Sequence, residues 1–165
     1  MEIRRARPED AGAIAEVHVR TWQAAYEHVF GAERLASVTV ERRLPMWKTI
    51  LNDGQVVSFV AESEADGVVG FATVGASRDE DAQGELYSIY VDAGSWGSDA
   101  ARSLMRSVLA ALRESGYQDA ILWVLADNPR ARRFYEREGW HDDGGRKRGE
   151  FLGLAVEEAR FRIEL

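Results

Sequence analysis

The segment from residue 84 to residue 126 limits the possible folds more than any other part of the chain. Residues 84–92 have the β-branched and aromatic side chains of a strand. Residues 98–115 carry apolar side chains at three- and four-residue spacing, which predicts an amphipathic helix. Residues 119–126 are apolar at nearly every position, as expected of a strand covered on both faces. The order strand, helix, strand therefore predicts an α/β protein.

Flanking segments extend this unit. The elements predicted from periodicity, caps and turn residues are, in chain order, a strand at 2–7, a helix opened by Pro8, a loop at 27–38, a helix at about 39–51, strands at 55–63, 67–76 and 84–92, a helix at about 98–115, a strand at 119–126, a helix from Asn128 to Gly139, and strands at about 146–154 and 156–164. We expect a mixed central sheet of about seven strands with helices on both faces. With no linker or repeat, residues 1–165 are expected to form a single domain.

Charge and composition disfavour several classes of protein. The net charge of −7 argues against general nucleic-acid binding, although a local basic patch can exist within an acidic total. The absence of cysteine excludes disulfides, thiolate metal sites and a cysteine nucleophile. The three histidines lack metal-ligand spacing, and no apolar run approaches the roughly 20 residues of a membrane span. We therefore expect a cytoplasmic protein with neither a metal nor a membrane partner.

Two stretches, 85–105 and 127–140, resemble the GNAT superfamily of acyl-CoA-dependent N-acyltransferases. The second is the more specific match, because its residues fall where that family places Asn, Ala, Phe, Tyr, Gly and an aromatic residue. These are Asn128, Ala131, Phe134, Tyr135, Gly139 and Trp140. The family's phosphate loop reads Q/R-x-x-G-x-G/A, whereas residues 96–101 here have Trp first and Asp99 in place of the central glycine. The resemblance covers essentially the whole chain and implies a GNAT fold with acetyl-CoA as cosubstrate.

The resemblance implies that backbone N–H groups of the loop 96–101 bind the pyrophosphate of the coenzyme at a helix N-terminus. It also implies a bulge in strand 84–92 that separates this strand from strand 119–126 and makes room for pantetheine. The predicted cofactor-binding residues are Ile89, Tyr90, Val91, Trp96, Gly97, Ser98, Asp99, Ala100, Ala101, Arg102, Asn128 and Ala131. The helix at 129–138 has a basic face that either meets the coenzyme 3′-phosphate or is simply solvated, formed by Arg130, Arg132, Arg133 and Arg137.

Asp99 opposes phosphate binding at this loop. Two like charges about 5 Å apart repel by about 3 kcal/mol at an effective dielectric constant near 20, and by less than about 1 kcal/mol in water. The orientation of the carboxylate therefore decides the size of the effect. Asp99 is alternatively a helix N-cap or first-turn acid, and a cap would occupy amides that the phosphate needs. Arg102, one turn on, either compensates for the charge or is a solvated arginine.

The resemblance implies two catalytic residues, Glu85 and Tyr135. Freeing an amine of pKa about 10.4 at pH 7 costs about 4.6 kcal/mol, so a base is useful, and Glu85 lies where some family members keep one. Tyr135 occupies the family position of the acid that protonates the departing thiolate. The alternatives are an exposed acid at the strand end for Glu85 and a packing tyrosine for Tyr135. A backbone N–H within 88–91 is expected to bind the thioester oxygen.

The acceptor pocket is predicted from aromatic residues and one carboxylate. The predicted substrate-binding residues are Trp22, Tyr26, Glu27 and Tyr87, and the resemblance implies that Trp47 lines the same pocket. Aromatic rings beside a carboxylate suit a cationic amine, carried by a small molecule or a peptide. Trp and Tyr at helical spacing are equally explained as core residues.

Two functions follow from this sequence. The first is an enzyme that transfers acetyl from acetyl-CoA to a primary amine by direct attack. The second is a non-catalytic binding or regulatory module of the same fold, whose affinity for acyl-CoA is weakened by Asp99. A member directed at RNA is disfavoured by the net charge. The resemblance also implies a possible homodimer formed through the C-terminal strands.

Overall fold

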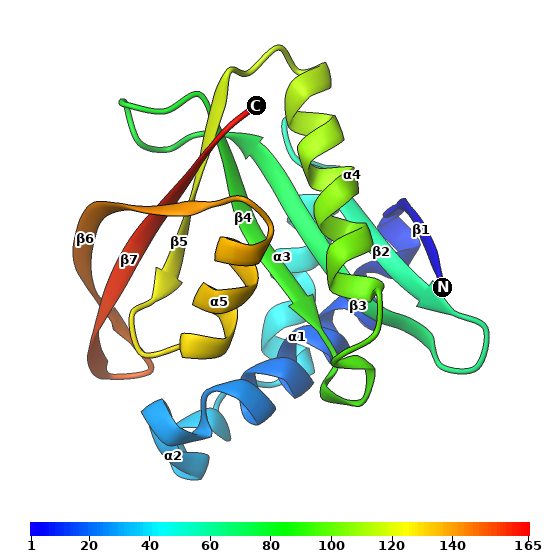
Figure 1. Cartoon of the computed structure of the whole chain (residues 1–165). Coiled ribbons are helices and arrows are strands. Elements are labelled where there is room, and N and C mark those ends of the chain that lie inside the picture. Colours follow the sequence, from blue (N-terminus) through cyan, green and yellow to red (C-terminus); the bar gives the residue numbers. More distant parts are fainter.

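Seven strands form one continuous sheet in the computed structural model, which describes all 165 residues (Figure 1). The strands are β1 (Glu2–Arg5), β2 (Val57–Ser63), β3 (Gly67–Ala76), β4 (Gly84–Val91), β5 (Asp119–Leu125), β6 (His141–Phe151) and β7 (Leu154–Glu164). Their order across the sheet is β1-β2-β3-β4-β5-β7-β6. Only β4 and β5 are parallel neighbours, so the predicted mixed sheet of about seven strands is confirmed.

Helices cover both faces of this sheet, as the sequence predicted. They are α1 (Ala11–Ala25), α2 (Glu27–Leu35), α3 (Val40–Asn52), α4 (Ala100–Glu114) and α5 (Pro129–Arg137). In Figure 1, α4 and α5 lie on one face, and α1 and α3 lie on the other. Neighbouring residues of β3 show the division, because Phe71 packs in the cluster with α1 and α3 whereas Ala72 packs in the cluster with α4. This alternation follows from the two-residue period of a strand.

The predicted loop at 27–38 is wrong, because residues 27–35 form helix α2. The backbone of this helix is interrupted at Gly31, where φ is 75° and ψ is 156°. Each helical piece is too short to show a helical period in the sequence. The segment is held by tertiary packing instead, since Phe30 and Leu35 are buried against Tyr26.

Strand β6 also begins earlier than expected, at His141. Its pairing with β7 is irregular between Asp142 and Arg146, a segment that contains Gly144 and Gly145. The predicted strand began at about residue 146, whereas the sheet continues on both sides of the irregularity.

The sheet opens between β4 and β5. These strands pair only at Gly84 with Ala120 and at Glu85 with Ile121, and no pairing continues beyond that point. On its other edge, β4 carries a bulge at Tyr87, because the register with β3 steps from Leu86 to Ser88. A bulge bends the strand that contains it. The bend directs the rest of β4 away from β5 and leaves half of its peptide groups facing the opening.

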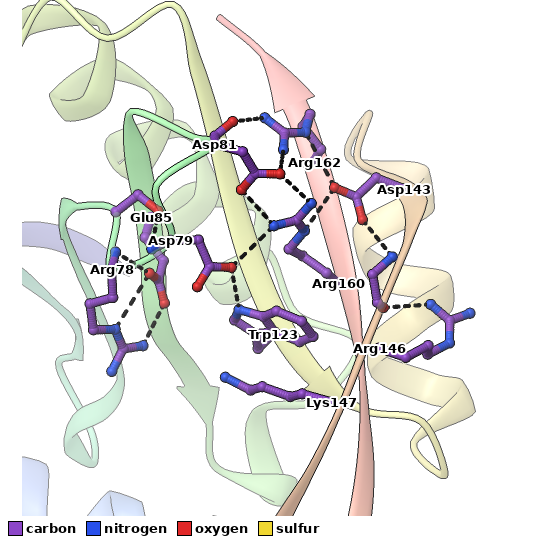
Figure 2. Close-up of polar contacts among 12 residues, drawn as sticks. Arg78, Asp79, Asp81, Glu85, Trp123, Asp143, Arg146, Lys147, Arg160 and Arg162 are labelled. Carbon is purple, nitrogen blue, oxygen red and sulfur yellow. Dashed lines mark hydrogen bonds and ion pairs between the residues drawn. The ribbon is translucent and has the colours of Figure 1, made fainter.

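An ion-pair network closes the sheet at the end where β4 and β5 still pair. Figure 2 shows Asp79, Asp81 and Asp143 gathered around Arg160, at 3.2, 2.8 and 2.8 Å. Arg162 bonds to Asp81 and Asp143 and also to Asp119. The network ties the loop between β3 and β4 to β6 and β7.

Replacing Arg160 with methionine is expected to lower the free energy of unfolding by about 2 kcal/mol. The change leaves several carboxylates facing one another with a single arginine between them, and part of that penalty is relieved by water. Urea unfolding at pH 7 measures the loss. The matched control is Arg148→Met on β6, whose exposed side chain makes no ion pair and whose loss is expected to cost less than about 0.5 kcal/mol. Equal losses in the two variants would mean that the network contributes nothing measurable.

Candidate active site

A cavity of about 670 Å³ occupies the opening between β4 and β5. The predicted site residues that line it are Trp22, Tyr26, Glu85, Tyr87, Ile89, Tyr90, Val91, Trp96, Gly97, Ser98, Asp99, Ala101, Arg102, Asn128, Ala131 and Tyr135. Ala100 and Glu27 lie outside it. Ala100 is the first residue of α4 and is fully buried in the core, and Glu27 is exposed at the start of α2. Trp47 also lies outside the cavity, because it is buried with Ile14 and Phe71. The cavity thus brings together the two stretches, 85–105 and 127–140, that carry the family resemblance.

The loop before α4 presents unpaired amides. The backbone N–H groups of Gly97, Asp99, Ala101 and Arg102 donate no hydrogen bond within the protein. Gly97 has a φ of 82°, in the left-handed region that favours glycine, and this conformation turns the chain into the helix. Free amides at a helix N-terminus attract anions through both hydrogen bonding and the helix dipole. This end of the cavity is suited to a phosphate group.

The Asp99 side chain does not occupy these donors. It is exposed and makes no capping hydrogen bond, and the N–H of Ala100 instead donates to the hydroxyl of Ser98 at 3.3 Å. The carboxylate is therefore solvated, which favours the weaker of the two repulsion values expected from the sequence. Asp99 opposes an anion without blocking the place where it would bind.

Arginine side chains surround the same end of the cavity. The guanidinium of Arg130 lies 3.4 Å from the ring centroid of Trp96, and Arg137 lines the cavity beside it. Burial and the neighbouring charge of Arg137 lower the pKa of Arg130, although an arginine remains charged in proteins. Arg102 donates a hydrogen bond to Glu138, the residue that follows α5, at 3.3 Å. The three arginines at this end of the cavity therefore outnumber its two acids, Asp99 and Glu138.

Tyr135 lies deeper in the cavity and is held by the start of α5. Asn128 caps that helix, because its Oδ1 accepts a hydrogen bond from the N–H of Ala131 at 3.2 Å. One turn further on, the Tyr135 ring packs against Phe134 and Phe161. Its hydroxyl has no hydrogen-bond partner in the protein, and burial raises the pKa of the phenol. Tyr135 is therefore a protonated donor at neutral pH.

Glu85 lies where β4 leaves β5 and is only 1% exposed. Its Oε1 accepts from the backbone N–H and the Nε of Arg78, at 3.0 and 3.4 Å, and its Oε2 accepts from Nη2 at 2.5 Å. Arg78 also lies over the ring of Tyr87, at 4.9 Å from its centroid, and the Tyr87 hydroxyl donates to the carbonyl of Ala76. Glu85 is thus held by an arginine that sequence reasoning did not include.

Aromatic residues line the cavity on the side of α1 and α2. The rings of Trp22 and Tyr26 meet at 4.8 Å, and Trp22 also contacts Phe151 at 6.4 Å. The Tyr26 hydroxyl accepts from Asn128 at 3.4 Å, whereas the indole N–H of Trp22 is buried without a partner. These residues serve as core and cavity wall at once.

Several lining residues were missed from the sequence. They are Arg78, Trp123, Lys147, Phe151 and Glu158, on β5, β6, β7 and the loop before β4. A strand residue enters a cavity only when the strand's register and face are fixed, and a single sequence supplies neither. No three His, Asp or Glu side chains come together here or elsewhere to hold a metal ion.

Comparison with known families identifies the class of protein to which this fold belongs. The chain belongs to the acetyltransferase (GNAT) family, whose model matches residues 12–140. The resemblance found in the sequence is therefore confirmed.

Two bacterial relatives are similar over most of the chain. One is the uncharacterized N-acetyltransferase YuaI of Bacillus subtilis, 33% identical over 77% of this chain and 73% of its own length. Another is the uncharacterized N-acetyltransferase Rv2669 of Mycobacterium tuberculosis, 31% identical over 83% of this chain and 86% of its own length. Neither name specifies an acceptor.

Solved structures share the fold at low sequence identity. The PaiA N-acetyltransferase of Thermoplasma acidophilum, solved with coenzyme A, has a TM-score of 0.76 at 16% identity and covers 99% of this chain and 98% of its own. The acetyltransferase YncA of Salmonella typhimurium, solved with acetyl-CoA, has a TM-score of 0.72 at 20% identity and covers 99% and 93%. No helix of the present chain is long and apolar enough to cross a membrane.

Proposed function

We propose that the protein transfers an acetyl group from acetyl-CoA to a primary amine of a small molecule or peptide. The observation that carries the proposal is the set of four unpaired amides at 97–102, placed at the mouth of a cavity that continues through the opening of the sheet to Tyr135. A diphosphate bound at these amides leaves the rest of the cavity for an extended arm and a thioester. The coenzyme complexes of the structural neighbours add support.

The proposed reaction is direct attack of the amine on the thioester carbonyl. The new N–C bond forms as the C–S bond breaks, and the leaving thiolate takes the proton of the Tyr135 hydroxyl. Backbone N–H groups of β4 beyond the bulge face the opening, where they bind the developing oxyanion. Ile89, Tyr90 and Val91 supply this stretch of strand. Tyr135 regains a proton from solvent after the coenzyme leaves.

Glu85 is the proposed base for the amine, acting through a water molecule. Its carboxylate has four lone-pair positions, and Arg78 occupies both positions of Oε1 and one of Oε2. The remaining position of Oε2 accepts the proton. Because Glu85 is only 1% exposed and is held by Arg78, a water molecule carries the proton from the amine to the carboxylate.

Titration of acetyl-CoA by calorimetry, followed by coenzyme A release with a panel of primary amines, tests the proposal. Micromolar binding with amine-dependent release is the expected result. Binding without release from any amine, or no detectable binding, would exclude the proposed enzyme and favour the non-catalytic module. The solvated Asp99 side chain leaves the loop open, which favours the enzyme over the module.

Replacing Asp99 with asparagine is expected to tighten acetyl-CoA binding by about two- to fivefold. The variant removes the negative charge at a solvated position, where repulsion of a pyrophosphate amounts to less than about 1 kcal/mol. The gain should shrink as salt is added. Calorimetry measures the dissociation constant, and Asp127→Asn, an exposed acid next to α5, is the matched control. An unchanged dissociation constant at low salt would refute the repulsion argument.

A further inference from the structure

Glu158 on β7 carries a carboxylate that the protein itself leaves nearly unpaired. The side chain lines the cavity and is only 13% exposed, yet it accepts no hydrogen bond. Its one ionic neighbour is Lys147, whose Nζ lies 3.7 Å away, beyond hydrogen-bond distance. Lys147 is 46% exposed and lies over the ring of Trp123, at 4.2 Å from its centroid. A sheltered carboxylate without donors is costly unless a ligand supplies them.

The other charged groups at this end of the cavity already have partners. Glu85 is held by Arg78. Arg160, two residues after Glu158 on β7, does not line the cavity and is held by the aspartates around it. Glu158 is therefore the charge that remains available to a ligand. Since Lys147 is largely exposed to solvent and only weakly engaged, an incoming cation can take its place.

The surroundings of Glu158 are aromatic and apolar. Glu158 lies opposite Leu125 on β5 and opposite Lys147 on β6, so the three side chains share one face of the sheet. A Cβ on Gly149 would lie 3.9 Å from Glu158 Oε2 and 3.2 Å from the Phe151 ring. The Glu158 carboxylate and the Phe151 ring thus lie on either side of the space next to Gly149. Because glycine has no side chain, this space stays open.

Glu158 and Tyr135 lie on opposite faces of the opened sheet. Tyr135 packs in the cluster that contains α4 residues, whereas Leu125 and Val156, beside Glu158, pack with Tyr26 and α2. The phosphate-binding loop leads into α4, on the face of Tyr135. A second substrate can therefore approach from the face of α2 without meeting the coenzyme.

We propose that Glu158, with Phe151 and Trp123, forms the binding site for the acceptor, and that this site selects a cationic amine on an apolar or aromatic body. The inference names the substrate class for the proposed transfer. It rests on the proposed function only in calling the bound amine the acceptor. Binding of the cation itself requires no turnover. Acceptors that carry a carboxylate near the amine are disfavoured by the same charge.

Benzyltrimethylammonium is the probe, because it has the charge and the aromatic body but cannot be acetylated. Binding is followed by the fluorescence of Trp22 and Trp123, which line the cavity. We expect Glu158→Gln to weaken binding about tenfold and to strengthen binding of benzoate. The matched control is Glu157→Gln, which removes the same charge from the opposite face of β7 and should stay within twofold of the unmodified protein.

A second variant, Lys147→Gln, guards against a folding defect in the first. It removes the competing cation and should tighten binding of the probe about threefold. Equal binding of the probe by the unmodified protein, Glu158→Gln and Lys147→Gln would overturn the inference, as would a preference of the unmodified protein for benzoate. These results are separate from the proposed function, which fails only if no amine releases coenzyme A from acetyl-CoA.

Discussion

Replacing Tyr135 with phenylalanine is expected to lower kcat about 100-fold and to leave the dissociation constant of acetyl-CoA within twofold. The substitution removes one oxygen and keeps the ring that packs on Phe134 and Phe161. Loss of a positioned general acid costs about 10²- to 10⁴-fold, and water can replace part of its role in an open cavity. Because the hydroxyl bonds to no protein group, its removal leaves no unsatisfied partner behind.

Steady-state kinetics with a fixed amine, together with calorimetry of acetyl-CoA, measures both quantities. Tyr117→Phe removes a hydroxyl outside the cavity and should behave as the unmodified protein. The raised pKa of Tyr135 adds an expectation about pH, because the phenol stays protonated throughout the range in which lysine-like amines become free bases. The rate should therefore rise with pH up to about 10 without a falling limb from Tyr135. Parallel losses of kcat and of coenzyme affinity in the phenylalanine variant would indicate a binding role.

The fold was accessible from the sequence where a single period dominates a long segment. Helix α4 and strand β5 appear within a few residues of their predicted bounds, because the helix has one apolar stripe and the strand is covered on both faces. Helix α2 was missed because Gly31 divides it into pieces shorter than a helical period can show. Hydrophobic periodicity thus fails to predict a segment whose helical structure depends on tertiary packing.

The candidate site divides in the same way. The loop at 96–101 and the start of α5 were found because their backbone geometry needs particular residues, such as Gly97 at a positive φ and Asn128 as a cap. Arg78 and Glu158 were missed because their positions depend on a bulge and on strand register. A helix cap can be predicted from about four consecutive residues. The neighbours of a strand residue depend on pairing with strands that are distant in the sequence.

Acid should destabilise the protein through His18, a buried histidine behind the cavity. Its Nδ1 accepts a hydrogen bond from the indole N–H of Trp47 at 3.0 Å, and its ring stacks on Tyr90. Burial, and secondarily the charge of Arg43, lowers the pKa of His18 to about 4. The imidazole is therefore neutral in the native protein. Protonation would turn Nδ1 into a donor facing another donor.

The free energy of unfolding is expected to fall by about 3 kcal/mol from this residue as the pH drops from about 6.5 to about 4. In that window the unfolded chain binds a proton at its ordinary pKa of about 6.5 and the folded chain does not, so each unit of acidification favours unfolding. Urea unfolding at several pH values, followed by tryptophan fluorescence, measures the slope. Aspartates with lowered pKa values, such as Asp142, add their own acid sensitivity mainly below this window.

His18→Asn isolates the contribution of the histidine, because the asparagine oxygen can still accept the Trp47 bond but does not titrate. The variant loses packing against Tyr90, Trp47 and Phe71, and we expect it to be less stable than the unmodified protein at pH 7. Its stability should nevertheless change little between pH 6.5 and 4, so the two curves should converge in acid. If the stability curves of the two proteins were parallel between pH 6.5 and 4, the folded protein would take up a proton at His18 as readily as the unfolded chain does. The interpretation of His18 as a neutral imidazole that packs against Tyr90 in this range would then be wrong.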